Sequence, residues 1–385
     1  MIDVTLTDDR PLYCVWAAHY PPHVGGVEQY TYNLAHALAK RGNRVVVVTT
    51  NLFDSPSDEI EADGVRVIRL PSYRLMKGRL PIPKRNAEYA SLMAELKKLP
   101  VSGVLVNTRF YGHSLEGMRY ARDLGLRPIV LDHGTAYLTI GNSVADLAIR
   151  AYERAITSRG KKYRPRYFGV SQASCVWLQE FGIEAEGVLS NSIDAPAYRN
   201  NASKRDFLKE LSLPHEVKSV AFVGRFSPEK GIKQLSQAAM LLEDEGIVFL
   251  AAGSGALFDE MQSSAPDNFF CLGSLAASDV SALLQQCQVF CLPSRSEGFC
   301  TALLEAGACA CVPVITHVGG TDELVPSPEY GTSLASADPE LIAIALRETF
   351  DALEQGSLSG LSIAQLVDEH YSWDSAAAHV EEAFA

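Results

Sequence analysis

The sequence predicts an α/β protein with two domains in tandem, each built around a parallel β-sheet. Its 385 residues exceed what one ordinary hydrophobic core accommodates. Apolar runs of strand length alternate with helical patterns along the chain, and this alternation starts again after about residue 190. A hydrophobic content of 47% and a charged content of 21% are typical of a globular protein.

The first strand, helix and second strand form the clearest unit. Residues 11–18 and 44–49 are predicted buried strands, apolar residues recur at helical spacing from Val27 to Leu38, and Gly42 ends the helix. Such a βαβ unit requires a parallel sheet. The other predicted strands are 65–70, 103–107, 128–132 and 167–170 in the first series, and 219–223, 247–252, 268–272, 289–293 and 312–316 in the second.

The polar, turn-rich segment SNSIDA separates the two series. We therefore expect an N-terminal domain of residues 1–190 and a C-terminal domain of residues 191–370. After about residue 335 the pattern is helical, and it ends in the amphipathic segment YSWDSAAAHVEEAFA at 371–385.

The net charge of −12 is unevenly divided. Residues 1–190 hold 24 Lys and Arg against 19 Asp and Glu, whereas the remainder holds 10 against 27. This asymmetry indicates two surfaces with different partners, although a chance bias in an acidic protein fits the counts as well. We expect no nucleic-acid partner.

Several classes of protein are disfavoured. The N-terminus has acids where a secretory signal would carry basic residues, and no stretch of about 18 apolar residues appears. The eight cysteines include no C-x-x-C pair, so buried thiols are favoured over zinc or redox sites. These features predict a cytoplasmic protein.

Two glycine-rich segments are weak signals for a ligand. Gly25 and Gly26 lie between the first strand and the first helix, where a backbone can approach a phosphate or a sugar; a tight turn is the alternative. Gly253-Ser254-Gly255 is a partial dinucleotide fingerprint without its third glycine. The P-loop pattern is absent, which disfavours the P-loop kinases.

The segment GRFSPEKG is more specific. It follows the first strand of the second series and precedes a helix. Arg225, Lys230 and Lys233 fall within nine positions of an otherwise acidic half, and an anionic ligand needs such a concentration of positive charge. A solvated loop is the alternative.

The segment SEGFCTALLEA combines two carboxylates with a helix N-terminus. Glu297 precedes the helix, and Glu305 lies within it. The free amides of Phe299, Cys300 and Thr301 would form a phosphate site. The flanking carboxylates could then bind the hexose and the ribose of a sugar nucleotide.

The segments GGVEQYTYNLAHALAKRG, GRFSPEKG, AGSG and EGFCTALLEA, in this order, resemble those of the retaining glycosyltransferases of family four. The resemblance covers essentially the whole chain, including an IDAPAYR segment like the family's domain-crossing signature. It implies the GT-B fold: two Rossmann-like domains facing across a cleft, with the donor nucleotide held by the second. It also implies that the helix at 371–385 packs back on the first domain. The run EAGACACVPV is one residue longer than the family pattern.

The resemblance also implies roles for individual residues. The catalytic residues would be His133, Arg225, Lys230 and Glu297, with the two cations neutralising the diphosphate. A purely structural hydrogen-bonding role is the alternative for His133. The donor-binding residues would be Gly25, Gly26, Gly224, Gly253, Ser254, Gly255, Gly298, Phe299, Cys300, Thr301 and Glu305.

The implied reaction moves a hexose-type sugar from a nucleotide-diphosphate donor to a glycan or lipid-linked acceptor. A UDP-sugar is favoured as the donor over a GDP-sugar. The leaving diphosphate would accept the acceptor's proton, and the protein would stabilise its charge. No Asp-x-Asp motif occurs, so we expect neither a metal nor another cofactor. A nucleotide-sugar epimerase of the same fold and a non-catalytic sugar-nucleotide binder are the alternatives.

Two basic stretches in the first half concern the acceptor. One spans residues 150–166 and contains a single acid, Glu153; the other, YRLMKGRLPIPKR, mixes basic and apolar residues. They fit peripheral attachment to an anionic membrane surface, or simply a solvated basic helix.

Overall fold

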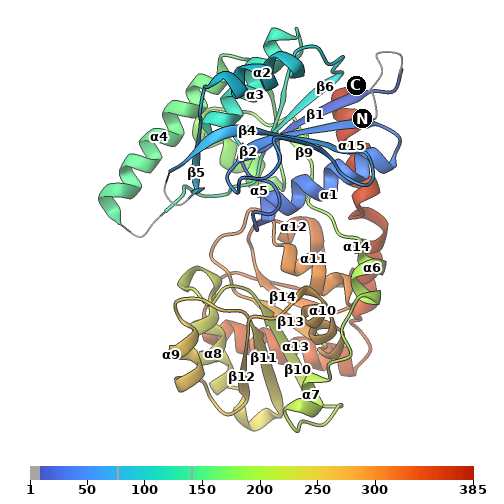
Figure 1. Ribbon diagram of the computed structural model, residues 1–385. Helices are drawn as coiled ribbons and strands as arrows, with labels where there is room; N and C mark the ends of the chain where they lie inside the picture. Colours follow the sequence, from blue (N-terminus) through green and yellow to red (C-terminus); the bar gives the residue numbers. More distant parts are fainter. Residues whose placement is uncertain (1–8, 76–77, 140–141) are drawn as a thin grey trace. The chain divides into compact units, whose positions relative to one another are not determined.

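The computed structural model describes residues 9–75, 78–139 and 142–385, which cluster into two compact units. Unit 1 takes in the described residues up to Val170, together with Ser174–Ser190 and Trp373–Ala385; unit 2 takes in Ser171–Ala173 and Asn191–Ser372. Each unit is an α/β domain with a mainly parallel sheet (Figure 1), as the sequence predicts.

The sheet of unit 1 has the order β3-β4-β2-β1-β6-β7-β8-β9. All neighbours are parallel except β3, which runs antiparallel to β4. Its strands are β1 (Leu12–Trp16), β2 (Arg44–Asn51), β3 (Asp58–Ile60), β4 (Arg66–Leu75), β6 (Gly103–Asn107), β7 (Ile129–Asp132), β8 (Arg166–Gly169) and β9 (Gly187–Val188). Strands such as β1 and β6 are wholly buried because helices cover both faces of a parallel sheet.

Parts of the segment YRLMKGRLPIPKR belong to two paired strands that the sequence did not predict. β4 continues beyond residue 70 to Leu75, and β5 (Leu80–Pro83) pairs with it antiparallel. Tyr73 and Ile82 pair across these strands, and both are exposed. Met76 and Lys77, which belong to this basic stretch, lie outside the described residues.

The helices of unit 1 follow its strands. They are α1 (Gly26–Lys40), α2 (Ala87–Leu96), α3 (Gly112–Asp123), α4 (Ser143–Lys161), α5 (Gln172–Leu178) and α15 (Trp373–Phe384). The first two residues of α5 cluster with unit 2. The core between helices and sheet includes the fully buried side chains of Trp16 and Tyr120, whose ring centroids lie 5.5 Å apart.

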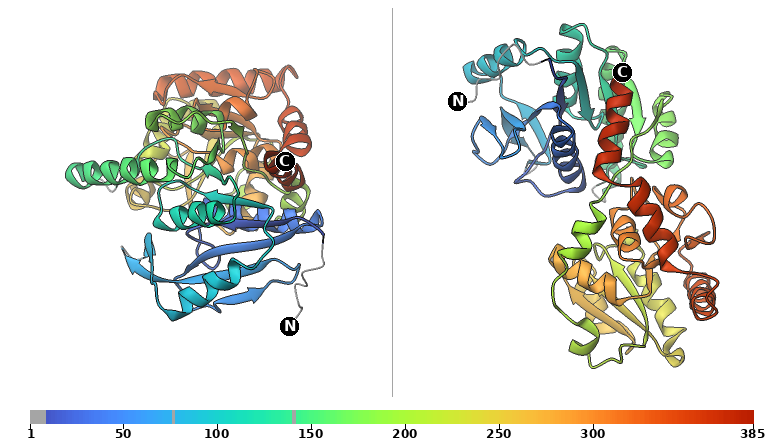
Figure 2. Two further views of the ribbon diagram at one scale, coloured as in Figure 1. Left: turned by 90° about the horizontal axis from the view of Figure 1, so that it is seen from above. Right: turned by 90° about the vertical axis from the view of Figure 1, so that its right-hand side faces the viewer.

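The last helix, α15, belongs to unit 1 and packs against α1 (Figure 2). Phe384 stacks on Tyr13 with ring centroids 4.6 Å apart. Arg41, which caps α1, binds Glu381 at 2.9 Å and Asp374 at 3.0 Å. Apolar stacking and two ion pairs therefore attach the end of the chain to the first domain.

Unit 2 has an all-parallel sheet in the order β12-β11-β10-β13-β14-β15. Its strands are β10 (Lys218–Val223), β11 (Ile247–Ala252), β12 (Phe269–Gly273), β13 (Val289–Leu292), β14 (Val312–Thr316) and β15 (Thr332–Leu334). Its helices are α6 (Ala195–Asn200), α7 (Phe207–Glu210), α8 (Ile232–Met240), α9 (Phe258–Ser264), α10 (Ala277–Gln286), α11 (Thr301–Ala308), α12 (Thr321–Leu324), α13 (Pro339–Glu354) and α14 (Gly360–His370).

The turn after α11 explains how the long EAGACACVPV run fits. Ala310 adopts the left-handed conformation with φ 61°, and a side chain at Gly360 would collide with its carbonyl oxygen. Gly307 lets α14 approach α11, since a side chain there would lie 2.9 Å from Val367 and 3.0 Å from Ile363. The glycines thus allow this turn and α14 to pack closely.

All eight cysteines are free thiols. Six are buried, as predicted, while Cys271 and Cys309 are half-buried. None of the helices in the described part of the chain combines the length and apolarity needed to cross a bilayer.

Candidate functional site

Three loops of unit 2 meet at the carboxyl edge of its sheet. They follow β10, β11 and β13, which are neighbours in the sheet, so all three leave it at the same edge. Phe226 in the first loop donates its amide to Ser254 in the second at 2.9 Å. Arg295 in the third donates its amide to Glu229 in the first at 2.8 Å. The predicted donor-site segments are therefore one connected structure.

Glycines make this loop packing possible. Gly253 (φ 148°) lies so close to the carbonyl oxygen of Gly224 that any side chain would collide with it. Gly255 (φ 156°) approaches the backbone of Phe226, and Gly231 (φ 71°) approaches the carbonyl of Pro293. The incomplete dinucleotide fingerprint thus has a packing role, because these φ values favour glycine.

The structure brings two predicted catalytic side chains together. Lys230, at the end of the first loop, lies with its Nζ 2.5 Å from Oε1 of Glu297 in the third loop. Both side chains are mostly buried, with exposed fractions of 19% and 11%. Arg225 is exposed in the same loop as Lys230. Lys233 instead binds Glu260 at 2.6 Å, so of the three cations singled out in this segment Arg225 and Lys230 remain for a ligand.

The N-terminus of α11 differs in one respect from the expectation. The amide of Cys300, which we expected to be free, donates to the carbonyl of Gly319 at 3.2 Å. The loop after β14 comes this close because Gly319 has no side chain to collide with the carbonyls of Glu297 and Gly298. The amides of Phe299 and Thr301 remain as candidates for binding phosphate at this helix end.

Glu305 lies on the second turn of α11 and is half-buried. Burial raises the pKa of Glu305 to about 7, while the neighbouring Tyr198 hydroxyl lowers it. Its carboxyl therefore changes charge near neutral pH. A sugar hydroxyl could be bound by it in either state, as an acceptor or as a donor.

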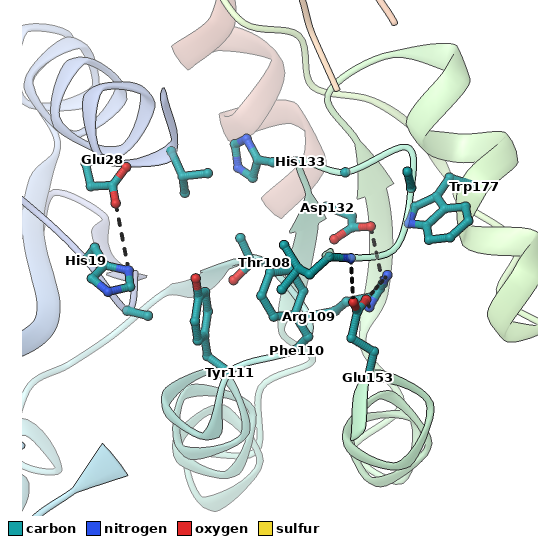
Figure 3. Close-up of a pocket in the computed structure, with 15 residues that line it drawn as sticks. His19, Glu28, Thr108, Arg109, Phe110, Tyr111, Asp132, His133, Glu153 and Trp177 are labelled. Carbon is teal, nitrogen blue, oxygen red and sulfur yellow. Dashed lines mark hydrogen bonds and ion pairs between the residues drawn. The ribbon is translucent and has the colours of Figure 1, made fainter. Parts of the chain in front are cut away.

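Unit 1 contains a cavity of about 260 Å³ at the carboxyl ends of β1, β6 and β7 (Figure 3). Its walls are formed by side chains of these strand ends and of α1, α4 and α5. They include His19, Glu28, Thr108, Arg109, Tyr111, Asp132, His133, Glu153 and Trp177. Of the predicted site residues in unit 1, His133 lines this cavity, whereas Gly25 and Gly26 precede its wall residues Val27 and Glu28.

His133 is held by a chain of hydrogen bonds. Its Nε2 donates to Oδ1 of Asn107 at 3.1 Å, and Asn107 donates to Thr31 at 2.8 Å. The ring packs edge-on against Tyr30 with centroids 4.9 Å apart. Burial lowers the pKa of His133 to about 3, so the imidazole is neutral at physiological pH. His133 thus has structural partners and still lines the cavity.

The double glycine has two different environments. Gly25 caps α1, and a side chain on it would collide with the carboxylate of Glu28. A side chain on Gly26 would meet nothing within 4 Å. Glu28 in turn lies 2.9 Å from Nδ1 of His23. The glycine at position 25 therefore makes room for Glu28, a residue that the sequence pattern did not single out.

A buried charge cluster in the cavity was also not predicted. The guanidinium of Arg109 lies 3.3 Å from Asp132 and 3.2 Å from Glu153, and all three side chains are at most 2% exposed. It also packs on the ring of Phe181, with 3.7 Å from its carbon to the centroid. Glu153 accepts the Leu138 amide at 2.9 Å and so fixes the loop after β7. The sequence feature that could have identified this cluster is the position of Arg109 and Asp132 at or just after the ends of strands.

Comparisons with known proteins agree with this arrangement. A model described as glycosyl transferases group 1 matches residues 203–353, and one described as glycosyltransferase family 4 matches residues 24–195. A human protein described as a subunit of phosphatidylinositol N-acetylglucosaminyltransferase is 23% identical over 96% of this chain and 75% of its own length.

Two solved structures share the fold over nearly the whole chain. A glycosyltransferase from Rickettsia africae has a TM-score of 0.74 and 17% identity, and covers 98% of both chains. The Anabaena protein HepE, in complex with UDP-glucose, has a TM-score of 0.68 and 18% identity, and covers 97% of this chain and 98% of its own. From the two family models and the architecture of the two units, the chain belongs to glycosyltransferase family four and has the GT-B fold.

Proposed function

We propose that this glycosyltransferase moves a hexose-type sugar, with retention of configuration, from a UDP-sugar, or less favourably a GDP-sugar, to a lipid-linked acceptor or a glycan. The observation that carries the proposal is the pairing of Lys230 with Glu297 at 2.5 Å, beside exposed Arg225, at the carboxyl edge of the sheet of unit 2. This edge is where open α/β sheets bind ligands.

The local charge supports a diphosphate as the ligand. After residue 190 the chain has 10 basic residues against 27 acidic ones, and yet two of the basic residues stand in this one loop. When a diphosphate binds, the ammonium of Lys230 can turn from Glu297 to a phosphate oxygen, which frees the Glu297 carboxylate for a sugar hydroxyl. The cations and the amides at the start of α11 would then stabilise the leaving group without a metal ion or another cofactor.

A matched set of variants tests this assignment. We expect Arg225→Ala and Lys230→Ala each to lower turnover of the donor by about 10²–10³-fold, the range found when one charge-stabilising group is removed. Lys233→Ala is the control, because this nearby lysine is turned to Glu260. Donor turnover would first be screened across UDP-, GDP- and ADP-sugars. If Arg225→Ala and Lys230→Ala both retain nearly the activity of the parent, the assignment of the donor site is wrong.

The same screen separates the alternative functions. A glycosyltransferase hydrolyses its donor slowly when no acceptor is present, an epimerase converts the donor to its epimer, and a non-catalytic binder leaves it unchanged. Chromatography of the products distinguishes the three outcomes.

The proposal of a lipid-linked acceptor rests on the surface of α4, which projects from the fold of unit 1 (Figure 1). Val144 is 81% exposed and Leu147 69% exposed, and Leu138 precedes them with 49%. Arg150 and Arg154 follow on the same helix, with their guanidinium groups over the ring of Tyr137, and Arg154 also pairs with Glu180 at 3.5 Å. Exposed apolar side chains next to basic ones suit the surface of an anionic membrane. The human relative also names a lipid, phosphatidylinositol, in its description.

Not all of the basic residues between 159 and 166 could face lipid, because some of them have structural partners. Lys161 donates to the carbonyls of Phe181 and Gly182, and Arg166 binds Glu186 at 2.7 Å, so both have structural partners. Arg159, Lys162 and Arg164 are exposed. These three, together with the exposed Arg150, remain available to a membrane.

Liposome co-sedimentation tests the membrane proposal. Binding should require anionic lipid, weaken with salt, and fall when Arg159, Lys162 and Arg164 are changed together to Gln, since each basic residue contributes about 1 kcal/mol. Changing Lys97 and Lys98 at the end of α2 to Gln is the control. Equal recovery in the supernatant with and without anionic liposomes at low salt would favour a soluble acceptor.

A further inference from the structure

The imidazole of His133 is fixed at one of its two nitrogens by hydrogen bonding. Its Nε2 donates to Oδ1 of Asn107 at 3.1 Å, the amide of Asn107 donates to Thr31, and the Thr31 hydroxyl donates to the carbonyl of Val27 at 2.7 Å. This chain makes Nε2 the protonated nitrogen and leaves Nδ1 as an acceptor. Because burial lowers the pKa of His133 to about 3, the ring keeps this neutral form at physiological pH.

One hydrogen bond does not fix the plane of the ring. Rotation about the bond that joins the imidazole to its Cβ moves Nε2 only slightly, because Nε2 lies near that axis, but it swings Nδ1 to a different direction. The ring of Tyr30, on α1, supplies the second constraint. It packs edge-on against His133 at an interplanar angle of 76°, with ring centroids 4.9 Å apart. The position of Tyr30 therefore determines where Nδ1 of His133 points.

The ring of Tyr30 is itself held by packing. The residue is 1% exposed, and its hydroxyl forms no hydrogen bond with any described part of the chain. Its orientation therefore depends on the groups that contact its ring. Within the described residues its aromatic contacts are His133 on one side and Trp373 on the other, the latter at 66° with centroids 5.6 Å apart. Trp373 thus supports the side chain that orients His133.

Trp373 is the first residue of α15, and this helix is attached to α1 along its length. The next residue, Asp374, pairs with Arg41 at 3.0 Å, and Glu381, about two turns further on, pairs with the same guanidinium at 2.9 Å. Phe384 stacks on Tyr13 at the far end. The indole is therefore carried by an anchored helix, and its position against Tyr30 is fixed by contacts made elsewhere along that helix.

We infer that Trp373 is a positioning residue for His133: through the ring of Tyr30, it holds the imidazole in the orientation that turnover requires. Trp373 is not among the described residues that line the cavity, whereas His133 is (Figure 3), so its effect passes through Tyr30. The consequence for turnover rests on the proposed function and on the catalytic role that the family resemblance gives to His133. The orientation of the ring does not, because it follows from contacts within unit 1.

The orientation can be measured on the full chain without a donor. In protein labelled with ¹⁵N-histidine, the signals of His133 are identified by their loss in His133→Gln. They should show a protonated Nε2 and an unprotonated Nδ1, with widely separated shifts. Trp373→Ala should move the two shifts toward each other, because a ring that turns can exchange between its tautomers. Trp373→Phe keeps an aromatic ring against Tyr30 and should keep the shifts apart.

The same variants are then assayed with the best donor from the screen of UDP-, GDP- and ADP-sugars. Trp373→Ala should lower kcat by about 10–100-fold and leave the KM for the donor within about twofold, because a misplaced catalytic group affects the transition state more than binding. Trp373→Phe should restore kcat to within about threefold of the parent. If Trp373→Ala does not fold, Trp373→Leu replaces it, since leucine keeps apolar bulk but presents no aromatic ring.

Phe384→Ala is the matched control. It removes a ring from the other end of the same helix, while the ion pair of Arg41 with Asp374 still holds the start of α15. This variant should lower the stability of unit 1 and leave both kcat and the His133 shifts at their parental values.

Several results would overturn the inference. One is unchanged His133 shifts in folded Trp373→Ala or Trp373→Leu. Others are parental kcat in a variant whose His133 shifts have moved, a Trp373→Phe variant as slow as Trp373→Ala, and an equal loss of kcat in Phe384→Ala.

The two measurements also separate this inference from the proposed function. If the His133 shifts respond to Trp373 while the parent turns over no donor, the proposed function fails and the positioning of the ring stands. If turnover depends on Lys230 while the His133 shifts do not respond to Trp373, the inference fails and the proposed function stands.

Discussion

Replacing Asp132 by Asn should stabilise unit 1 at neutral and alkaline pH, although this residue lines the cavity of the unit. Burial raises the pKa of Asp132 to about 6 from an ordinary value of 3.8, and this outweighs the opposing effect of Arg109. At pH 8 the native protein therefore contains a buried carboxylate that would be more stable protonated. An asparagine side chain resembles the protonated form in shape and charge.

The magnitude and the sign follow from the same pKa. The difference between 3.8 and about 6, at about 1.4 kcal/mol for each unit of pKa, gives about 3 kcal/mol in favour of the variant at pH 8. Because the native state holds this proton more tightly than the unfolded chain, the wild-type protein loses stability as pH rises from about 4 to about 6. The advantage of Asp132→Asn should grow across that window and be constant above about pH 7.

Urea unfolding at several pH values measures this difference. The three tryptophans, Trp16, Trp177 and Trp373, all belong to unit 1, so tryptophan fluorescence reports on that unit even if the two units unfold separately. Asp123→Asn is the control with the opposite sign, since a hydrogen bond from Arg122 lowers the pKa of Asp123. It should destabilise by less than about 1 kcal/mol at pH 8 and have no effect at low pH. If Asp132→Asn is no more stable than wild type at pH 8, or if its advantage is the same at pH 4, the reasoning is wrong.

Other changes have equally specific expected outcomes. Gly253→Ala should destabilise unit 2 by roughly 1–3 kcal/mol more than Gly246→Ala, because the side chain at 246 would enter open space. Hydrogen exchange of the amides in β10 and β11 measures this difference. Glu305→Gln should weaken UDP binding at pH 8 more than at pH 6, because the carboxyl changes charge near pH 7; calorimetry at both pH values measures this. Donor turnover should survive EDTA, and strict dependence on Mg²⁺ or Mn²⁺ would contradict the proposed metal-free chemistry. Phe384→Ala should lower the urea midpoint of the tryptophan signal, because it removes the stack on Tyr13.

The central strands were the most predictable part of the fold. β6, β11 and β14 begin and end at the predicted residues, because a strand buried on both faces is a continuous apolar run bounded by turns. The edge elements β3, β5, β9 and β15 were missed. They are short or carry polar residues, and their pairing depends on neighbours that are distant in sequence.

For the candidate sites, too, the sequence predicted local segments but not the contacts between them. The two segments that contain Lys230 and Glu297 were recognised, but their contact depends on loops 67 positions apart meeting at one sheet edge. Glu153 was interpreted only as the single acid in a basic stretch that either faces an anionic membrane or is solvated. Its burial against Arg109 follows from which side of α4 packs on the sheet, and the charge pattern of one helix does not contain that information.

The attachment of α15 to unit 1 has a consequence for the order in which the protein folds during synthesis. Unit 2 is nearly continuous in sequence between Asn191 and Ser372, so almost all of it is available once those residues have left the ribosome. Unit 1 begins first but lacks the partner of Tyr13 and Arg41 until Phe384 and Glu381 emerge. Domains usually fold in the order of translation. Here the earlier domain should be the last to complete, and until then the surface of α1 that α15 covers is open to chaperones.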